Sequence, residues 1–153
     1  KPTLYHYFGN KEGILKTVLE FYFTPFLSEL SDLAGAQKDL PLILEDLGFL
    51  FLKSSEREPS FWRFMLSINF SPSDSVPYRC VQAHLEKQFR ILETLFKREV
   101  RRYGNMKGKE HLIAVSFIGL MHTHVSLVLN RHTRVSDKLV WNVVHQFLYG
   151  IFT

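Results

Sequence analysis

Residues 3–15 read TLYHYFGNKEGIL, and the interpretation of the whole chain starts from this stretch. The run ending at Phe8 is typical of the last turns of a helix, and Gly9 suits the C-terminal capping position. Asn10 can cap a new helix at once, because its short side chain accepts a hydrogen bond from a free backbone N–H. The sequence therefore predicts two helices joined by a very short turn.

Apolar residues recur at helical spacing through the rest of the chain, and no stretch alternates as a strand would. We expect an all-α fold, with helices over about 10–35, from 39, over 59–70, over 78–103, over 109–130 and from 136. Pro25 should kink the first helix near Tyr22, since it lacks a backbone donor and its ring clashes with the preceding turn. The predicted buried stripe of 78–103 is Val81, Leu85, Phe89, Leu92, Phe96, Val100 and Tyr103.

Composition excludes several classes of protein. With 46% hydrophobic residues and a net charge of only +4, the 153-residue chain is not disordered as a whole. The single cysteine, Cys80, cannot form an internal disulfide, which favours a reducing cytoplasm. Residues 112–129 lack formal charge and approach the length of a membrane span. Their hydroxyl and histidine side chains are costly in hydrocarbon, so we expect a helix buried on both faces and no membrane partner.

The last two helices each carry apolar or small residues on two sides. On 109–130, a face of small residues lies opposite a bulky apolar face, and small residues let another helix approach closely. A monomer of this length has too little protein to cover both helices, which predicts a homodimer. The predicted interface residues are Ser116, Gly119, Thr123, Ser126, Val140, Val144, Phe147 and Leu148.

The stretch from Thr3 to Leu15 resembles the end of the helix-turn-helix in the tetracycline-repressor (TetR) family. The family pattern is a Thr-Leu/Ile-Tyr-x-Tyr/His-Phe run, then Lys-Glu/Asp, then an apolar pair, and nearly every position matches. The resemblance implies a TetR-like helical bundle. Residues 1–9 would be a remnant of the DNA-binding domain, and residues 10–153 the ligand-binding and dimerisation domain. Because the family's earlier helices precede this motif, operator binding would need residues ahead of Lys1.

A recognition helix presents polar and aromatic donors to the major groove and phosphates while its other face stays in the core. Lys11 stands in the first turn of the following helix, where its ammonium and the free backbone amides suit a phosphate. The resemblance implies that Pro2, Tyr5 and His6 lie near bases or sugar-phosphate, and that Thr3 and Lys11 contact phosphate. The alternative is an ordinary solvated helix face.

Aromatic residues gather in the middle of the chain, where they either form plain core or line a cavity for an apolar or aromatic effector. The candidate pocket residues are Phe61, Trp62, Met65, Cys80, His84, Phe89, Phe117 and Met121. No cofactor is expected.

Other chemistries are less favoured. The seven histidines include no His-x-x-x-His pair, so a metal site is not expected. Cys80 has no partner that would make it a nucleophile, and no catalytic residues are predicted. The cations between Lys97 and Lys109 suit a helix C-terminus, with a second nucleic-acid patch as the alternative.

These observations predict a ligand-responsive, DNA-binding transcriptional regulator that acts as a repressor. The protein is not expected to be an enzyme. One alternative is a helical small-molecule-binding or enzymatic domain without a DNA partner. Another is a dimerisation module without a cavity.

Overall fold

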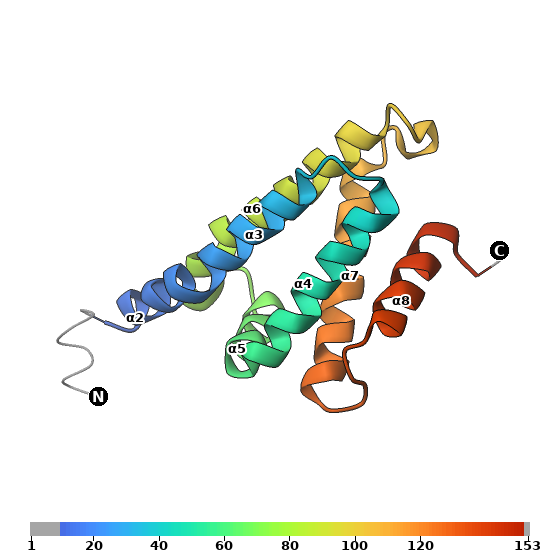
Figure 1. Ribbon diagram of the computed structural model, residues 1–153. Helices are drawn as coiled ribbons and strands as arrows, with labels where there is room; N and C mark the ends of the chain where they lie inside the picture. The colour runs from blue at the N-terminus through green and yellow to red at the C-terminus, as the bar shows by residue number, and fades with distance from the viewer. Residues whose placement is uncertain (1–9, 152–153) are drawn as a thin grey trace.

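A long helical segment begins at Lys11, ends at Ala34 and forms one edge of the molecule (Figure 1). The computed structural model describes residues 10–151. The segment consists of α2 (Lys11–Val18), the π-helical turn η1 (Leu19–Phe23) and α3 (Thr24–Ala34). Asn10 caps it as predicted, because its side chain accepts a hydrogen bond from the Gly13 N–H at 2.8 Å.

The π-helical turn ends at Phe23, two residues before Pro25. Here the Thr24 N–H donates to the carbonyl of Leu19, five residues back. Pro25 has no N–H, and its ring would clash with a regular turn, so the chain widens by one residue at this point. A kink was predicted near Tyr22; the structure has a π turn there, through which the helical segment continues.

Three helices follow: α4 (Leu40–Arg57), α5 (Pro59–Asn69) and α6 (Val76–Glu99). Pro59 opens α5 as predicted. The α6 helix begins two residues before the predicted start, because the Ser75 side chain accepts a hydrogen bond from the Tyr78 N–H at 3.3 Å. It ends at Glu99 instead of Tyr103, and the chain turns through the short 3-10 helix η2 (Gly104–Met106).

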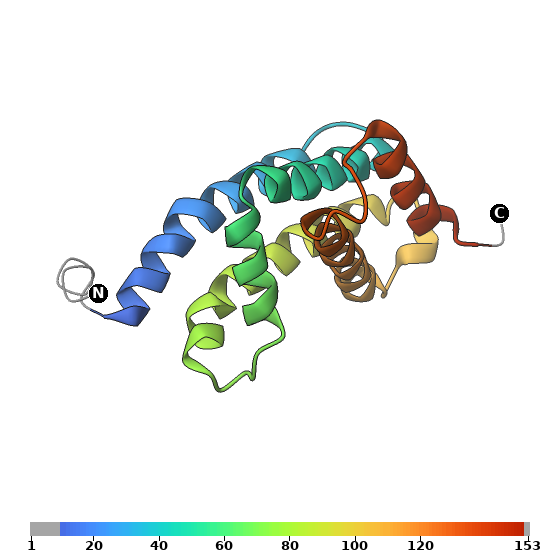
Figure 2. The same ribbon diagram turned by 90° about the horizontal axis from the view of Figure 1, so that it is seen from below.

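The last two helices are α7 (Glu110–Leu129) and α8 (Asp137–Tyr149). Ser136 caps α8 as predicted, accepting a hydrogen bond from the Leu139 N–H at 3.1 Å. The α6 helix runs alongside α3 in the same direction (Figure 1), and α7 packs on both α4 and α6 (Figure 2). The α8 helix packs mainly on α4, so α4 lies at the centre of the core. Helices and their connections make up all of residues 10–151, which confirms the all-α class.

Close packing of α8 on α4 depends on Gly48. A Cβ atom at this position would lie 3.1 Å from the Val140 Cγ1 and 3.9 Å from the Val144 Cγ2. Val140 and Val144 are buried in this contact, 1% and 0% exposed. Their prediction as interface residues is wrong, because the face of α8 that carries them is used within the protomer.

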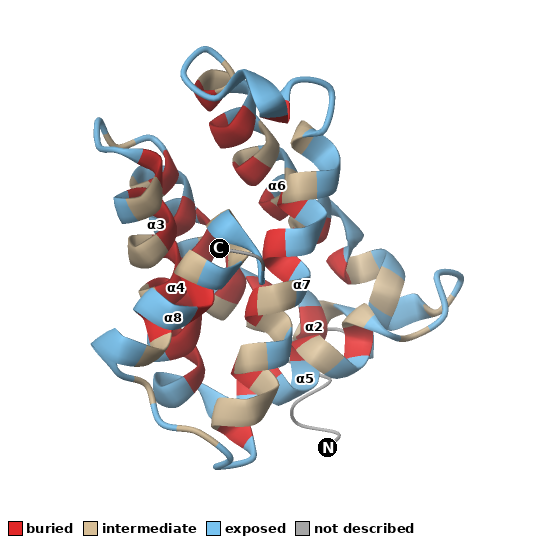
Figure 3. Cartoon of the chain, turned by 90° about the vertical axis from the view of Figure 1, so that its right-hand side faces the viewer, coloured by how far each residue is buried: buried red, intermediate tan, exposed pale blue. Residues whose placement is uncertain are grey.

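The α7 helix has two different faces, visible in the burial pattern of Figure 3. Ala114, Phe117 and Met121 are buried in the core, as predicted for the bulky face. Gly119 and Thr123 on the small-residue face are exposed, so burial on both faces is not found within the protomer. By length and composition α7 could cross a membrane, with 33% of its most apolar window buried, but a single such helix is weak evidence for a span.

Candidate functional site

An internal void lies where η1, α5, α6 and α7 meet. Its volume is about 10 Å³, which is on the order of the space that one water molecule needs. It is lined by Phe23, Phe61, Trp62, Met65, Leu66, Asn69, Leu85, Gln88 and His122. Helices from the first, middle and last thirds of the chain therefore meet at one point.

Three of the nine lining residues are large aromatic side chains: Phe23, Phe61 and Trp62. Phe61 of α5 meets Phe23 of η1 edge to face, with ring centroids 6.0 Å apart. It meets Trp62 in the same way, also at 6.0 Å. The Trp62 indole N–H donates to the Ser54 hydroxyl at 2.8 Å, and this bond satisfies the buried donor and anchors α5 to α4.

The polar residues of the wall, Asn69, Gln88 and His122, carry no formal charge at pH 7. Gln88 of α6 is 1% exposed, and neither its Oε1 nor its Nε2 has a hydrogen-bond partner within residues 10–151. His122 of α7 lies against the rings of Phe51 and Trp62. Burial lowers the pKa of His122 to about 4, so its imidazole is neutral at pH 7. None of the lining residues in the described part of the chain is Lys, Arg, Asp or Glu.

The void brings together three of the eight residues predicted for the pocket: Phe61, Trp62 and Met65. Phe117 and Met121 are buried but do not line the void, since they pack toward α8 and α4. These two side chains belong to the core.

The three α6 residues predicted for the pocket, Cys80, His84 and Phe89, also lie outside the void. Cys80 is a free, half-buried cysteine. His84 stacks on Phe23, with ring centroids 5.5 Å apart. It therefore contacts a residue of the wall without lining the void itself. Phe89 is half-buried beside His111.

Sequence reasoning missed Gln88 and His122. Gln88 lies three residues after Leu85 and four before Leu92, so it occupies a position on the apolar stripe of α6 that the prediction gives to Phe89. His122 lies four residues after Ile118 and three before Val125 on the buried side of α7. The signal that could have found them is a polar residue at a position where the helical stripe is otherwise apolar and buried.

The residues predicted to contact DNA fall mostly outside the described part of the chain. Pro2, Thr3, Tyr5 and His6 lie there, and only Lys11 can be placed. Lys11 is exposed at the start of α2, the end of the long helical segment that projects from the body (Figure 1).

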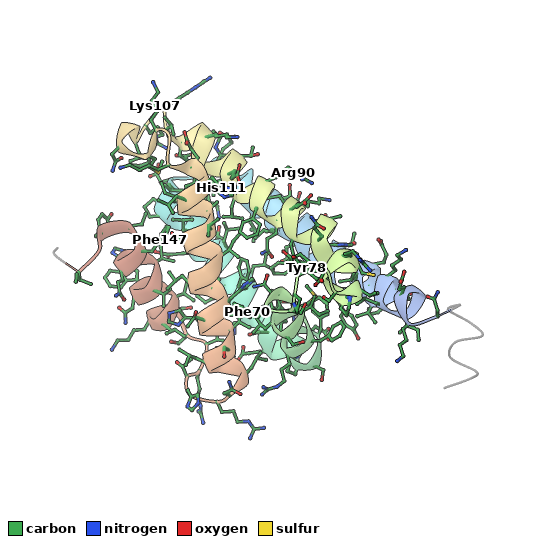
Figure 4. All side chains as sticks on the ribbon, turned by 180° about the vertical axis from the view of Figure 1, so that it is seen from behind. Phe70, Tyr78, Arg90, Lys107, His111 and Phe147 are labelled. Carbon is green, nitrogen blue, oxygen red and sulfur yellow. The ribbon has the colours of Figure 1, made fainter. Side chains whose placement is uncertain are left out.

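The outer faces of α7 and α8 form an exposed apolar surface. Figure 4 looks onto α7, with Phe147 of α8 on one side. A groove of about 500 Å³ runs between these helices and the α6–α7 turn, and Ser116, Phe147 and Leu148 all line it. Of the predicted interface residues, Ser116, Gly119 and Thr123 are exposed, and Ser126, Phe147 and Leu148 are half-buried.

The basic residues at the end of α6 are partly paired. Arg102 contacts the Asp39 carboxylate at 3.0 Å, and Arg98 contacts Glu99 at 3.1 Å. Lys107 projects from the tip of the α6–α7 turn (Figure 4). No group of three or more metal-ligating side chains occurs between residues 10 and 151.

No protein-family model, curated protein or solved structure matches this chain.

Proposed function

We propose that this chain is the ligand-binding and dimerisation body of a cytoplasmic, DNA-binding transcriptional regulator of the TetR type. It acts as a repressor whose effector binds inside the helical body and releases operator DNA. A DNA-binding domain of the TetR type needs helices ahead of the motif at residues 3–15, so DNA binding is tested on the product of the full gene. The sequence motif at residues 3–15 supports this proposal.

The observation that carries the proposal is the position of Phe23. This residue lines the internal void and belongs to the π turn of the helical segment that starts at Lys11. A ligand that pushes on Phe23 therefore acts directly on the helix that leads to the DNA-binding motif. An effector needs only a different affinity for the two positions of that helix to shift their populations.

Two copies joined through the outer faces of α7 and α8 complete the mechanism. Gly119 and Thr123 leave room for a neighbouring helix, and Leu112 is 63% exposed beside them. Trp141 and Tyr149 of α8 are 50% and 53% exposed. In such a dimer, a small shift of the Lys11 helix changes the spacing of two recognition helices, which must match half-sites about 34–36 Å or a multiple apart.

Lys11 provides the test of the DNA contact. In the protein extended by the residues encoded ahead of Lys1, Lys11→Ala should weaken binding to DNA from the gene's own upstream region. The slope of log affinity against log salt should flatten by about one, because one phosphate contact is lost. The measurement is fluorescence anisotropy at several salt concentrations.

Lys138→Ala is the matched control, since Lys138 is also an exposed lysine in the first turn of a capped helix. It should leave the salt slope unchanged. An unchanged slope for Lys11→Ala would contradict the phosphate role. Absence of DNA binding by the unmodified protein would favour the alternative, a small-molecule-binding domain without a DNA partner.

A further inference from the structure

The buried amide of Gln88 is the least satisfied polar group in the core. Buried side-chain amides are almost always hydrogen-bonded, because removing them from water without a partner costs stability. Gln88 is 1% exposed, yet its Nε2 donor and its Oε1 acceptor have no partner in the part of the chain that the structure describes. Both atoms belong to a residue that lines the internal void.

The void beside Gln88 is small. At about 10 Å³ it is of water size, so any larger molecule must move a wall. The half-buried Leu66 and Asn69 form the part of the wall on the last turns of α5. The connection that follows α5 is exposed, with Phe70 80% exposed (Figure 4). This end of α5 is therefore the part of the wall that we expect to move when a larger molecule enters.

The walls select against charge. Phe23, Phe61 and Trp62 provide aromatic faces and edges, and the polar wall residues Asn69, Gln88 and His122 carry no formal charge at pH 7. A carboxylate or ammonium group placed here would be buried without a counter-charge, which is strongly unfavourable. A neutral aromatic body is what this wall accepts.

We propose that the void takes a neutral aromatic molecule that bears a carboxamide-type group, with a hydrogen-bond donor and acceptor side by side. The ligand carbonyl accepts from the Gln88 Nε2–H, and the ligand N–H donates to the Gln88 Oε1. This pairing satisfies both orphaned atoms at once. The proposal rests on the function proposed above only in taking this molecule as the effector.

Three probes of nearly equal size separate the effects of the ligand's hydrogen-bond donor, its acceptor and its charge. Benzamide offers both a donor and an acceptor, acetophenone offers only the acceptor, and benzoate brings a charge. Benzamide should bind at least about tenfold more tightly than acetophenone, because acetophenone leaves the Gln88 acceptor unpaired. Benzoate should bind more weakly than either probe at pH 7.

Binding is followed by the fluorescence of Trp62, which lines the void. Trp141→Phe removes the other of the two tryptophans, and Trp141 is half exposed on the outer face of α8. In this background, the benzamide-dependent signal reports on the void alone. Isothermal titration calorimetry on the unmodified chain gives the affinities independently.

Gln88→Met removes the amide and keeps the length of the side chain. It should abolish the preference for benzamide over acetophenone. It should also leave the ligand-free chain at least as stable in urea, because an unpaired buried amide is lost. Gln82→Met is the matched control on the same helix, since Gln82 is exposed and already bonded to Glu86. It should preserve the preference.

Several results would overturn this assignment. They are equal binding of benzamide and acetophenone, tighter binding of benzoate, a preference that survives in Gln88→Met, or no binding of any probe. Its failure is separable from failure of the regulator proposal. DNA binding by the extended protein, without a benzamide preference, overturns the ligand class alone. A Gln88-dependent benzamide preference in a protein that never binds DNA overturns the regulator proposal alone.

Discussion

At the scale of single residues, three partly buried histidines of α6 and α7 link the stability of the fold to pH. Burial lowers the pKa of His84 and His124 as well as that of His122. The Nδ1 atoms of His84 and His124 are buried without a hydrogen-bond partner within the described residues. Because burial disfavours protonation of these histidines in the folded state, acid lowers the stability of the fold.

His122 makes the clearest contribution to that dependence. Its pKa is 6.5 in the unfolded chain and about 4 in the folded chain. Between these values only the unfolded state takes up the proton, so stability falls as the pH is lowered from 6.5 to 4 and this contribution levels off below 4. The full difference between the two pKa values corresponds to a loss of about 3 kcal/mol in the free energy of unfolding.

The prediction is tested with His122→Phe, which keeps a ring among Phe51 and Trp62 and removes the titrating group. Urea unfolding of this variant should lose less stability between pH 6.5 and pH 4 than the unmodified chain does. His132→Asn, on the exposed turn after α7, controls for the replacement of a histidine as such. An acid dependence as steep in His122→Phe as in the unmodified chain would contradict a lowered pKa at His122.

At the scale of elements, close approach between helices is decided by where the small residues lie. Gly48 on α4 meets the valines of α8, whereas a Cβ atom at Gly119 on α7 would have nothing within 4 Å among the described residues. The same residue type therefore serves a tight internal contact in one helix and leaves an open face in another. The two positions form a natural pair for comparison.

Alanine at either position gains helix propensity worth about 1 kcal/mol. Gly119→Ala should keep that gain, whereas Gly48→Ala should lose most of it, because the new Cβ lies 3.1 Å from the Val140 Cγ1. Gly48→Val should destabilise the chain by about 1–3 kcal/mol through overpacking. The measurement is the free energy of unfolding in urea. A Gly48→Val protein as stable as the unmodified chain would contradict the packing of α8 on α4.

Much of the element structure could be predicted from sequence, because its signals are local. The caps at Asn10 and Ser136 and the start of α5 at Pro59 follow from side chains next to the backbone groups that they satisfy or replace. The true end of α6 was less visible, since Val100 and Tyr103 continue the apolar spacing after the helix has stopped.

The candidate site was predictable only in part, because it is assembled by tertiary packing. Phe61, Trp62 and Met65 lie on one short helix and share a face, so their grouping follows from helical spacing. Phe23 and His122 join them from distant parts of the chain, and no local pattern specifies that meeting. The assignment of Val140 and Val144 to an interface failed for the same reason, since the sequence does not show which apolar face of α8 meets α4.

At the scale of the whole molecule, the open faces of α7 and α8 predict a homodimer. Thr123→Arg places a long cation in the small-residue face and should shift the protein toward the protomer mass in sedimentation experiments. Arginine is tolerated on an exposed helix, so the fold should be kept. Thr94→Arg is the matched control, because Thr94 is exposed on α6, away from this face. A Thr123→Arg protein that stays dimeric would place the interface elsewhere.

The most direct test of the whole account is the affinity of the extended protein for DNA. Fluorescence anisotropy compares a duplex from the gene's upstream region with a scrambled duplex of the same length and composition at one fixed salt concentration. The account predicts binding to the upstream duplex at least about a thousandfold tighter than to the scrambled one. Equal affinity for the two duplexes, or no binding to either, would contradict it.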